Sequence, residues 1–113
     1  MSFRLYLLQR LTALLMVPLI IGHLAVIYYA TRNGLSAADI LARTRGSIGW
    51  GLNYTVFVVA AAMHGAIGLR GVLREWGPGW IGKSERRLEL AMWVFGVALA
   101  LLGLRAVAAM VLR

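Results

Sequence analysis

The sequence predicts an all-α membrane protein, with three transmembrane helices and a short interfacial helix in the first loop. Of the 113 residues, 61% are hydrophobic and 14% are charged, whereas soluble domains carry roughly 25% charged residues. A chain of this size cannot bury so much apolar surface in one core of its own. Three apolar runs are each long enough to cross the ~30 Å hydrocarbon layer of a bilayer. Together they predict a single membrane domain over residues 1–113.

The first span is predicted over about residues 5–30 and carries Pro18 in its interior. Because proline removes one backbone donor, we expect the helix to bend there. Tyr28 and Tyr29 mark its far end as interfacial anchors. The alternative is a cleaved signal peptide, but its apolar core would be only about 7–15 residues long. The run 11–30 is longer, so we expect a retained span.

The first connection, residues 31–49, is polar. Ser36 is followed three residues later by Asp39, which is similar to a capping box with Asp in place of Glu. This pattern predicts a short helix that ends near Thr44. Its apolar and basic residues favour an interfacial position, and an ordinary polar loop is the alternative.

The second span is predicted over about residues 52–73, with Trp76 as an anchor at its far interface. The third span, over about residues 88–112, follows a connection rich in glycine and charged residues. Small side chains recur along the third span in a stripe that suits close helix packing: Gly96, Ala100 and Gly103.

The net charge of +8 reflects 12 Lys and Arg against 4 Asp and Glu. These basic residues lie mostly at the edges of apolar runs, which indicates headgroup contact and membrane orientation. Basic and aromatic residues do not interleave as single-stranded nucleic acid would require, so no nucleic-acid partner is expected. Lys and Arg are more frequent at the N-terminus and in the second loop, which favours a cytoplasmic N-terminus. The absence of cysteine excludes disulfides and iron–sulfur clusters ligated by this chain.

The only two histidines, His23 and His64, both lie within predicted spans. A histidine at such depth is costly unless it is coordinated or hydrogen-bonded, and a bond to a neighbouring helix is the simplest explanation. Proton relays use chains of carboxylates, which this chain confines to loops and helix ends. Zinc requires three or four ligands. Haem requires one or two axial histidines, an apolar slot and basic residues, and it fits this pattern best.

The depths of the two histidines indicate that they do not clamp one haem together. Taking Leu8 and Arg74 as the inner edges, His23 lies about 22 Å deep and His64 about 15 Å deep. Axial ligands of one upright haem should lie at similar depth. We therefore expect each histidine to meet a histidine from a second chain.

Basic residues flank this region on the predicted inner side. Arg10 stands at the inner end of the first span, where it either snorkels to headgroups or pairs with a haem propionate or quinone carbonyl. Arg70 follows His64 by six residues toward the inner face, within reach of a propionate. Trp76 is either an interface anchor or a ligand contact.

Two motifs carry a resemblance to a known family. The first is Arg10-Leu-Thr-Ala13, and the second is His64-x-x-x-Gly68-Leu-Arg70, followed by Glu75-Trp76. With three spans in the same order, the chain resembles, over nearly its full length, the cytochrome b membrane-anchor subunits of succinate dehydrogenase and fumarate reductase.

The resemblance implies roles for individual residues. His64 matches the axial ligand of haem b, and Arg10 and Thr12 match positions near the quinone head and the haem propionates. Trp76 stands where many members have a tyrosine that contacts quinone, so an indole N–H would replace the phenol. His23 matches the first-helix histidine of members with two haems. The resemblance therefore implies two haems b, shared with a second membrane-anchor chain.

The implied function is an electron-conducting anchor in the bacterial cytoplasmic membrane. It would hold an iron–sulfur subunit and a flavoprotein subunit, pass electrons to quinone, and have no catalytic activity alone. One alternative is a haem-free anchor of the same complex. Another is a small assembly or packing subunit of a different membrane complex. The scarcity of intramembrane carboxylates counts against a third alternative, a homo-oligomeric pore.

Overall fold

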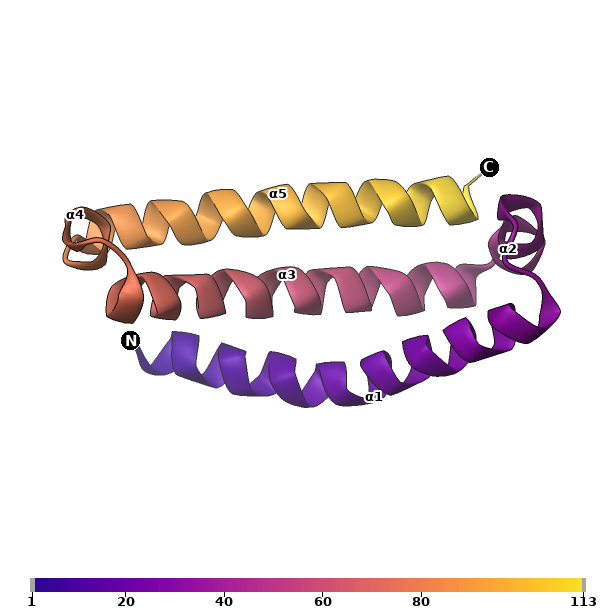
Figure 1. Ribbon diagram of the computed structural model, residues 1–113, viewed down its shortest axis with the longest axis horizontal. Coiled ribbons are helices and arrows are strands. Elements are labelled where there is room, and N and C mark those ends of the chain that lie inside the picture. The colour runs from indigo at the N-terminus through magenta and orange to yellow at the C-terminus, as the bar shows by residue number, and fades with distance from the viewer. Residues whose placement is uncertain (1, 113) are drawn as a thin grey trace.

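The computed structural model describes residues 2–112, which form five helices and no strand. In chain order the elements are α1 (Phe3–Asn33), α2 (Ala37–Thr44), α3 (Ile48–Trp76), α4 (Gly79–Gly82) and α5 (Glu85–Val111). Figure 1 shows the three long helices side by side, with α3 between α1 and α5. The three long helices have the length and apolarity to span a membrane. The predicted fold class is therefore confirmed.

Four of the helices begin after a serine that caps them. In each case the serine Oγ accepts a hydrogen bond from the backbone N–H three residues further on, which satisfies one of the free donors of the first turn. The serines are Ser2, Ser36, Ser47 and Ser84. Because these caps lie outside the apolar runs, α1 and α3 extend beyond the predicted spans at both ends, and α5 starts before residue 88.

The short helix α2 lies in the first loop, as its capping pattern predicts. Ser36 Oγ accepts from the N–H of Asp39 at 3.1 Å and donates to its carboxylate at 2.7 Å. Thr44 Oγ1 donates to the carbonyl of Met110 at 2.9 Å, and the N–H of Gly46 donates to the carbonyl of Val111 at 2.7 Å. These bonds satisfy carbonyls at the end of α5 that have no partner within the helix. The first loop is thereby tied to the C-terminal end of the bundle.

The helices α3 and α5 pack most closely at the predicted small-residue stripe. A Cβ atom added to Gly96 would lie 3.0 Å from the Cβ of Ala66, and one added to Gly103 would lie 2.5 Å from a methyl group of Val58. Because carbon atoms normally approach to about 3.5–4.0 Å, the two glycines allow this approach. The stripe is therefore used inside the chain, between α3 and α5.

The helix α1 packs on the other side of α3, antiparallel to it (Figure 1). It contains Pro18 and bows away from α3 near its middle (Figure 1), as expected of a proline that cannot donate its backbone bond. Most of the less exposed side chains of α1 are three, four or seven residues apart, which defines one face toward α3: Leu5, Gln9, Thr12, Met16, Leu19, Val26 and Ala30.

The two ends of the bundle carry different elements. The N-terminus and α4 lie at one end, and α2 and the C-terminus lie at the other (Figure 1). The one-turn helix α4 follows Pro78 in the second connection, where the sequence indicates only a loop. Many large apolar side chains of α1 and α5 remain exposed, which suits helices whose outer faces meet lipid or another membrane subunit.

Candidate functional site

His64 lies at the seam between α3 and α1 and is half-buried. Its Nδ1 atom is 3.2 Å from Oγ1 of Thr12, a residue of α1 that is only 6% exposed. Among residues 2–112, His64 makes no other hydrogen bond, so its Nε2 atom is without a partner. The same residues contain no cluster of three or more His, Cys, Asp or Glu side chains suited to a metal ion. This seam therefore offers one imidazole nitrogen as a ligand, and no complete ligand set.

Arg70 lies on α3 about 9 Å along the helix axis from His64 and is only 5% exposed. Its Nη2 atom donates to a carboxylate oxygen of Glu85 at 2.6 Å, and Arg74 pairs with the other oxygen of the same carboxylate. This shared carboxylate joins the end of α3 to the start of α5. The cluster of two guanidinium groups and one carboxylate keeps a net positive charge.

Two nitrogen atoms of Arg70, Nε and Nη1, are buried without a hydrogen-bond partner in residues 2–112. The Oε1 atom of Gln9 is buried and unpartnered as well, and its amide lies beside Gly68. Leaving a buried donor or acceptor unsatisfied costs about 1–3 kcal/mol. This end of the α1–α3 seam is therefore suited to bind a polar or anionic group.

Sequence reasoning missed two residues of this region, Gln9 and Glu85. Gln9 belongs to the stripe of α1 that faces α3, so the alternation of three and four residues signals its position. Glu85 follows the capping Ser84 in the first turn of α5, where a carboxylate is favoured by the helix dipole. Neither signal identifies Arg70 as a neighbour.

The three residues predicted around a quinone are not brought together within this chain. Thr12 faces His64, whereas Arg10 is exposed with its guanidinium over the ring of Tyr6, at 5.8 Å from the centroid. Trp76 is 83% exposed at the end of α3. When the residues are counted along α1 and α3 from the Thr12–His64 contact, the levels of Arg10 and Trp76 are about 15 Å apart along the bundle axis.

His23 lies further along α1, beside two aromatic rings of α3. Its ring meets those of Tyr54 and Phe57 edge-on, with centroids 6.1 Å and 5.4 Å away. His23 remains exposed and makes no hydrogen bond within residues 2–112. It borders a cavity of about 400 Å³ that reaches Arg43 of α2 and Trp50 of α3. The ring nitrogens of His23 are therefore open to a partner from outside the chain.

The structure corrects the depth difference between the two histidines. The hydrogen bond to His64 sets Thr12 level with it, so His23, eleven residues further along α1, lies about 16 Å away along the axis. The difference of about 7 Å from the sequence is too small. The estimate of about 7 Å rests on placing Leu8 and Arg74 at the same level, whereas the observed register separates these two residues by about 9 Å along the axis.

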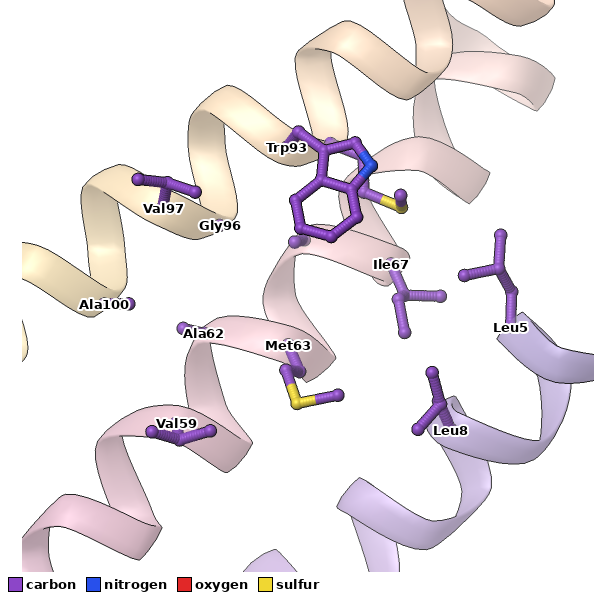
Figure 2. A pocket seen from close by; sticks show the side chains of 12 residues that line it. Leu5, Leu8, Val59, Ala62, Met63, Ile67, Trp93, Gly96, Val97 and Ala100 are labelled. Atoms are coloured by element: carbon purple, nitrogen blue, oxygen red, sulfur yellow. The ribbon is translucent and has the colours of Figure 1, made fainter.

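A second cavity, of about 250 Å³, lies between α1, α3 and α5 and is apolar (Figure 2). Leu5 and Leu8 approach it from α1, Met63 and Ile67 from α3, and Trp93 from α5 (Figure 2). Met63, the neighbour of His64 in sequence, therefore lines a different space. The polar seam of His64 and this apolar cavity lie on different sides of α3.

The fold and the site define an integral membrane protein of three long helices, with one buried arginine and a histidine held at a helix seam. A model of the family "succinate dehydrogenase/fumarate reductase transmembrane subunit" matches residues 2–104. The chain belongs to this family, and it is thus a membrane component of complexes that also contain soluble subunits. No curated protein and no solved structure matches the chain.

Proposed function

We propose that this chain is a haem-b-binding anchor of a succinate:quinone oxidoreductase, with His64 as an axial ligand. The observation that carries the proposal is the state of the His64 ring. Its Nδ1 is engaged by Thr12, and its Nε2 has no partner among residues 2–112. Histidines that ligate metals commonly bond a second group through the other ring nitrogen. A half-buried imidazole in this arrangement fits the needs of a haem.

Arg70 is proposed to hold a haem propionate. Its buried Nε and Nη1 groups have no partner among residues 2–112, while Nη2 is taken by Glu85. A guanidinium in this state has N–H donors left for a carboxylate, an anion that Arg binds through charge-assisted hydrogen bonds. A second carboxylate would also balance the positive charge of the Arg70–Glu85–Arg74 cluster. Bound haem would supply a one-electron redox centre at this level of the membrane.

The second axial ligand is proposed to come from another membrane-anchor subunit. His23 is the only other histidine, and it lies about 16 Å from the level of His64. We propose that His23 serves a second haem b, nearer the end of the bundle that carries α2. Its exposure and its lack of a hydrogen bond within residues 2–112 support a ligand from outside the chain.

The anchor is further proposed to dock an iron–sulfur subunit and a flavoprotein subunit and to deliver electrons to quinone. The end with the N-terminus and α4 is rich in basic side chains, which favours docking of acidic surfaces: Arg4, Arg74, Lys83, Arg86 and Arg87. The excess of Lys and Arg at this end supports its placement on the cytoplasmic side of the membrane. The membrane itself is proposed to be the cytoplasmic membrane of a bacterium.

The decisive experiment is a reduced-minus-oxidised optical spectrum of the complex purified from its source through a tag on this chain. A b-type α-band and co-purifying flavoprotein and iron–sulfur subunits are expected. His64→Ala should abolish one haem, and His23→Ala should abolish the other. Met63→Ala, beside His64 but lining a different cavity, is the control and should retain both. A complete complex without the band would establish the haem-free alternative. A chain without a flavoprotein partner would establish the assembly-subunit alternative.

Arg10 and Trp76 lie about 15 Å apart along the bundle axis, so each is proposed separately as a quinone contact, while the hydroxyl of Thr12 is engaged at His64. Arg10→Gln and Trp76→Phe should each raise the KM for quinone. Succinate oxidation with a soluble dye as acceptor should stay unchanged, since the dye takes electrons without the membrane site. An unchanged quinone KM in both variants would refute these contacts.

A further inference from the structure

Thr12 makes three close contacts through a single oxygen. Its Oγ1 atom lies 2.7 Å from the carbonyl oxygen of Leu8, 3.1 Å from that of Gln9, and 3.2 Å from Nδ1 of His64. Thr12 lies on the face of α1 that packs against α3, and it is only 6% exposed. The two carbonyls belong to the preceding turn of the same helix, the usual partners of a threonine within a helix.

The hydroxyl of Thr12 has one proton and two lone pairs. Carbonyl oxygens only accept, so the proton is directed to the preceding turn, where the contact with Leu8 is the shortest of the three. The lone pairs of Oγ1 then remain for His64, and this contact requires a proton on Nδ1. A neutral imidazole carries one proton in all. Nε2 is therefore left with a bare lone pair, the form that binds a metal.

We infer that Thr12 is a positioning residue that holds His64 in the Nδ1–H tautomer and directs its Nε2 lone pair to haem iron. The haem part of this inference rests on the proposed function, whereas the tautomer rests on the contacts above. The role differs from the one that the family resemblance implies for Thr12, a position near the quinone head. Its burial and its three contacts leave no free group for a quinone.

The hydrogen bond from Nδ1–H of His64 to Thr12 changes the electronic state of the imidazole. A hydrogen bond accepted from Nδ1–H makes the ring more basic and stabilises the oxidised iron more than the reduced iron. Loss of the Thr12 hydroxyl should therefore raise the midpoint potential of the haem at His64. It should also weaken haem binding by about 10- to 100-fold, as loss of an outer hydrogen-bond partner typically does.

The first test needs no haem. The full chain, with ¹⁵N-labelled histidine and reconstituted in lipid bilayers, is measured by NMR at a pH where the imidazoles are neutral. His64→Ala assigns the signals. The wild type should show a protonated Nδ1 and a bare Nε2 at His64. Thr12→Val, which keeps the shape and removes the hydroxyl, should shift the population toward the Nε2–H form, and Thr12→Ser should restore it. A wild-type Nε2–H signal would overturn the inference.

The second test uses the purified complex. Thr12→Val should lower the haem content and raise the midpoint potential, and Thr12→Ser should recover both. Thr31→Val is the matched control, because Thr31 bonds the carbonyl of Tyr28 in the same way but touches no histidine. If Thr12→Val leaves the haem content and the midpoint potential unchanged, the haem part of the inference is overturned. The same holds if the variant raises only the KM for quinone. A wild-type complex without haem would refute the proposed function, and the NMR result would still decide the tautomer.

Discussion

The contact between α5 and α3 at Gly103 gives a quantitative prediction for the stability of the bundle. A Cβ atom at Gly103 would lie 2.5 Å and 2.9 Å from the two methyl groups of Val58 and 3.2 Å from its Cβ. Carbon atoms at contact prefer about 3.5–4.0 Å, so Gly103→Ala must open the interface by about 1 Å. Val58 is branched at Cβ and has little rotamer freedom to move aside.

The cost of Gly103→Ala follows from this geometry. Overpacking of a tight interface typically costs about 1–3 kcal/mol, and we expect about 2 kcal/mol here. Gly96→Ala meets the Cβ of Ala66 at 3.0 Å and should cost less, about 1 kcal/mol. Gly71→Ala meets nothing within 4 Å. It should be neutral or stabilise the helix by up to about 1 kcal/mol, because alanine favours helix over glycine.

The assay uses the absence of cysteine in the chain. Ile48→Cys and Leu112→Cys place two labels on exposed positions at the same end of α3 and α5. Energy transfer between donor and acceptor dyes then reports helix separation as SDS is added to detergent micelles. The midpoint should fall in the order Gly71→Ala, Gly96→Ala, Gly103→Ala. The reasoning is refuted if Gly103→Ala resists SDS as well as Gly71→Ala does.

Two further predictions concern contacts that join distant parts of the chain. Glu85→Gln removes the charge shared by two arginines and leaves the buried Arg70 without its counter-ion, so the SDS midpoint should fall. Glu75→Gln, an exposed carboxylate in no ion pair within residues 2–112, is the control, and an equal loss in both would contradict the role of the pair. Thr44→Val removes the bond from α2 to the end of α5 and should destabilise this docking by about 1 kcal/mol. Faster proteolysis of the first loop is the expected readout, and an unchanged rate would contradict it.

The helices follow closely from local sequence signals. The three apolar runs predict the spans, and their ends differ from the observed helices by up to four residues because the serine caps lie in the polar flanks. The pattern from Ser36 to Thr44 predicts α2 correctly. The single turn of α4 was not predicted, because four residues are too few to show a helical period.

The candidate site follows from the sequence only in its residue types. His64 and Arg70 stand out as polar residues in an apolar run, but their neighbours come from distant positions. Thr12 is 52 residues from His64, and Glu85 is 15 residues from Arg70. Local periodicity predicts which face of a helix is buried, and it does not predict which residue of the next helix lies opposite.

The apolar runs are enough to specify a three-span membrane protein, because the bilayer thickness and the lack of water in its core dictate the length and polarity of each span. The register of α1 against α3, in contrast, follows from the packing of the helices and not from any local pattern. In lipid, apolar helices can slide past one another with little change in hydrophobic contact, so close packing and a few polar bonds select one register. That register pairs Thr12 with His64 and separates the levels of the two histidines by about 16 Å.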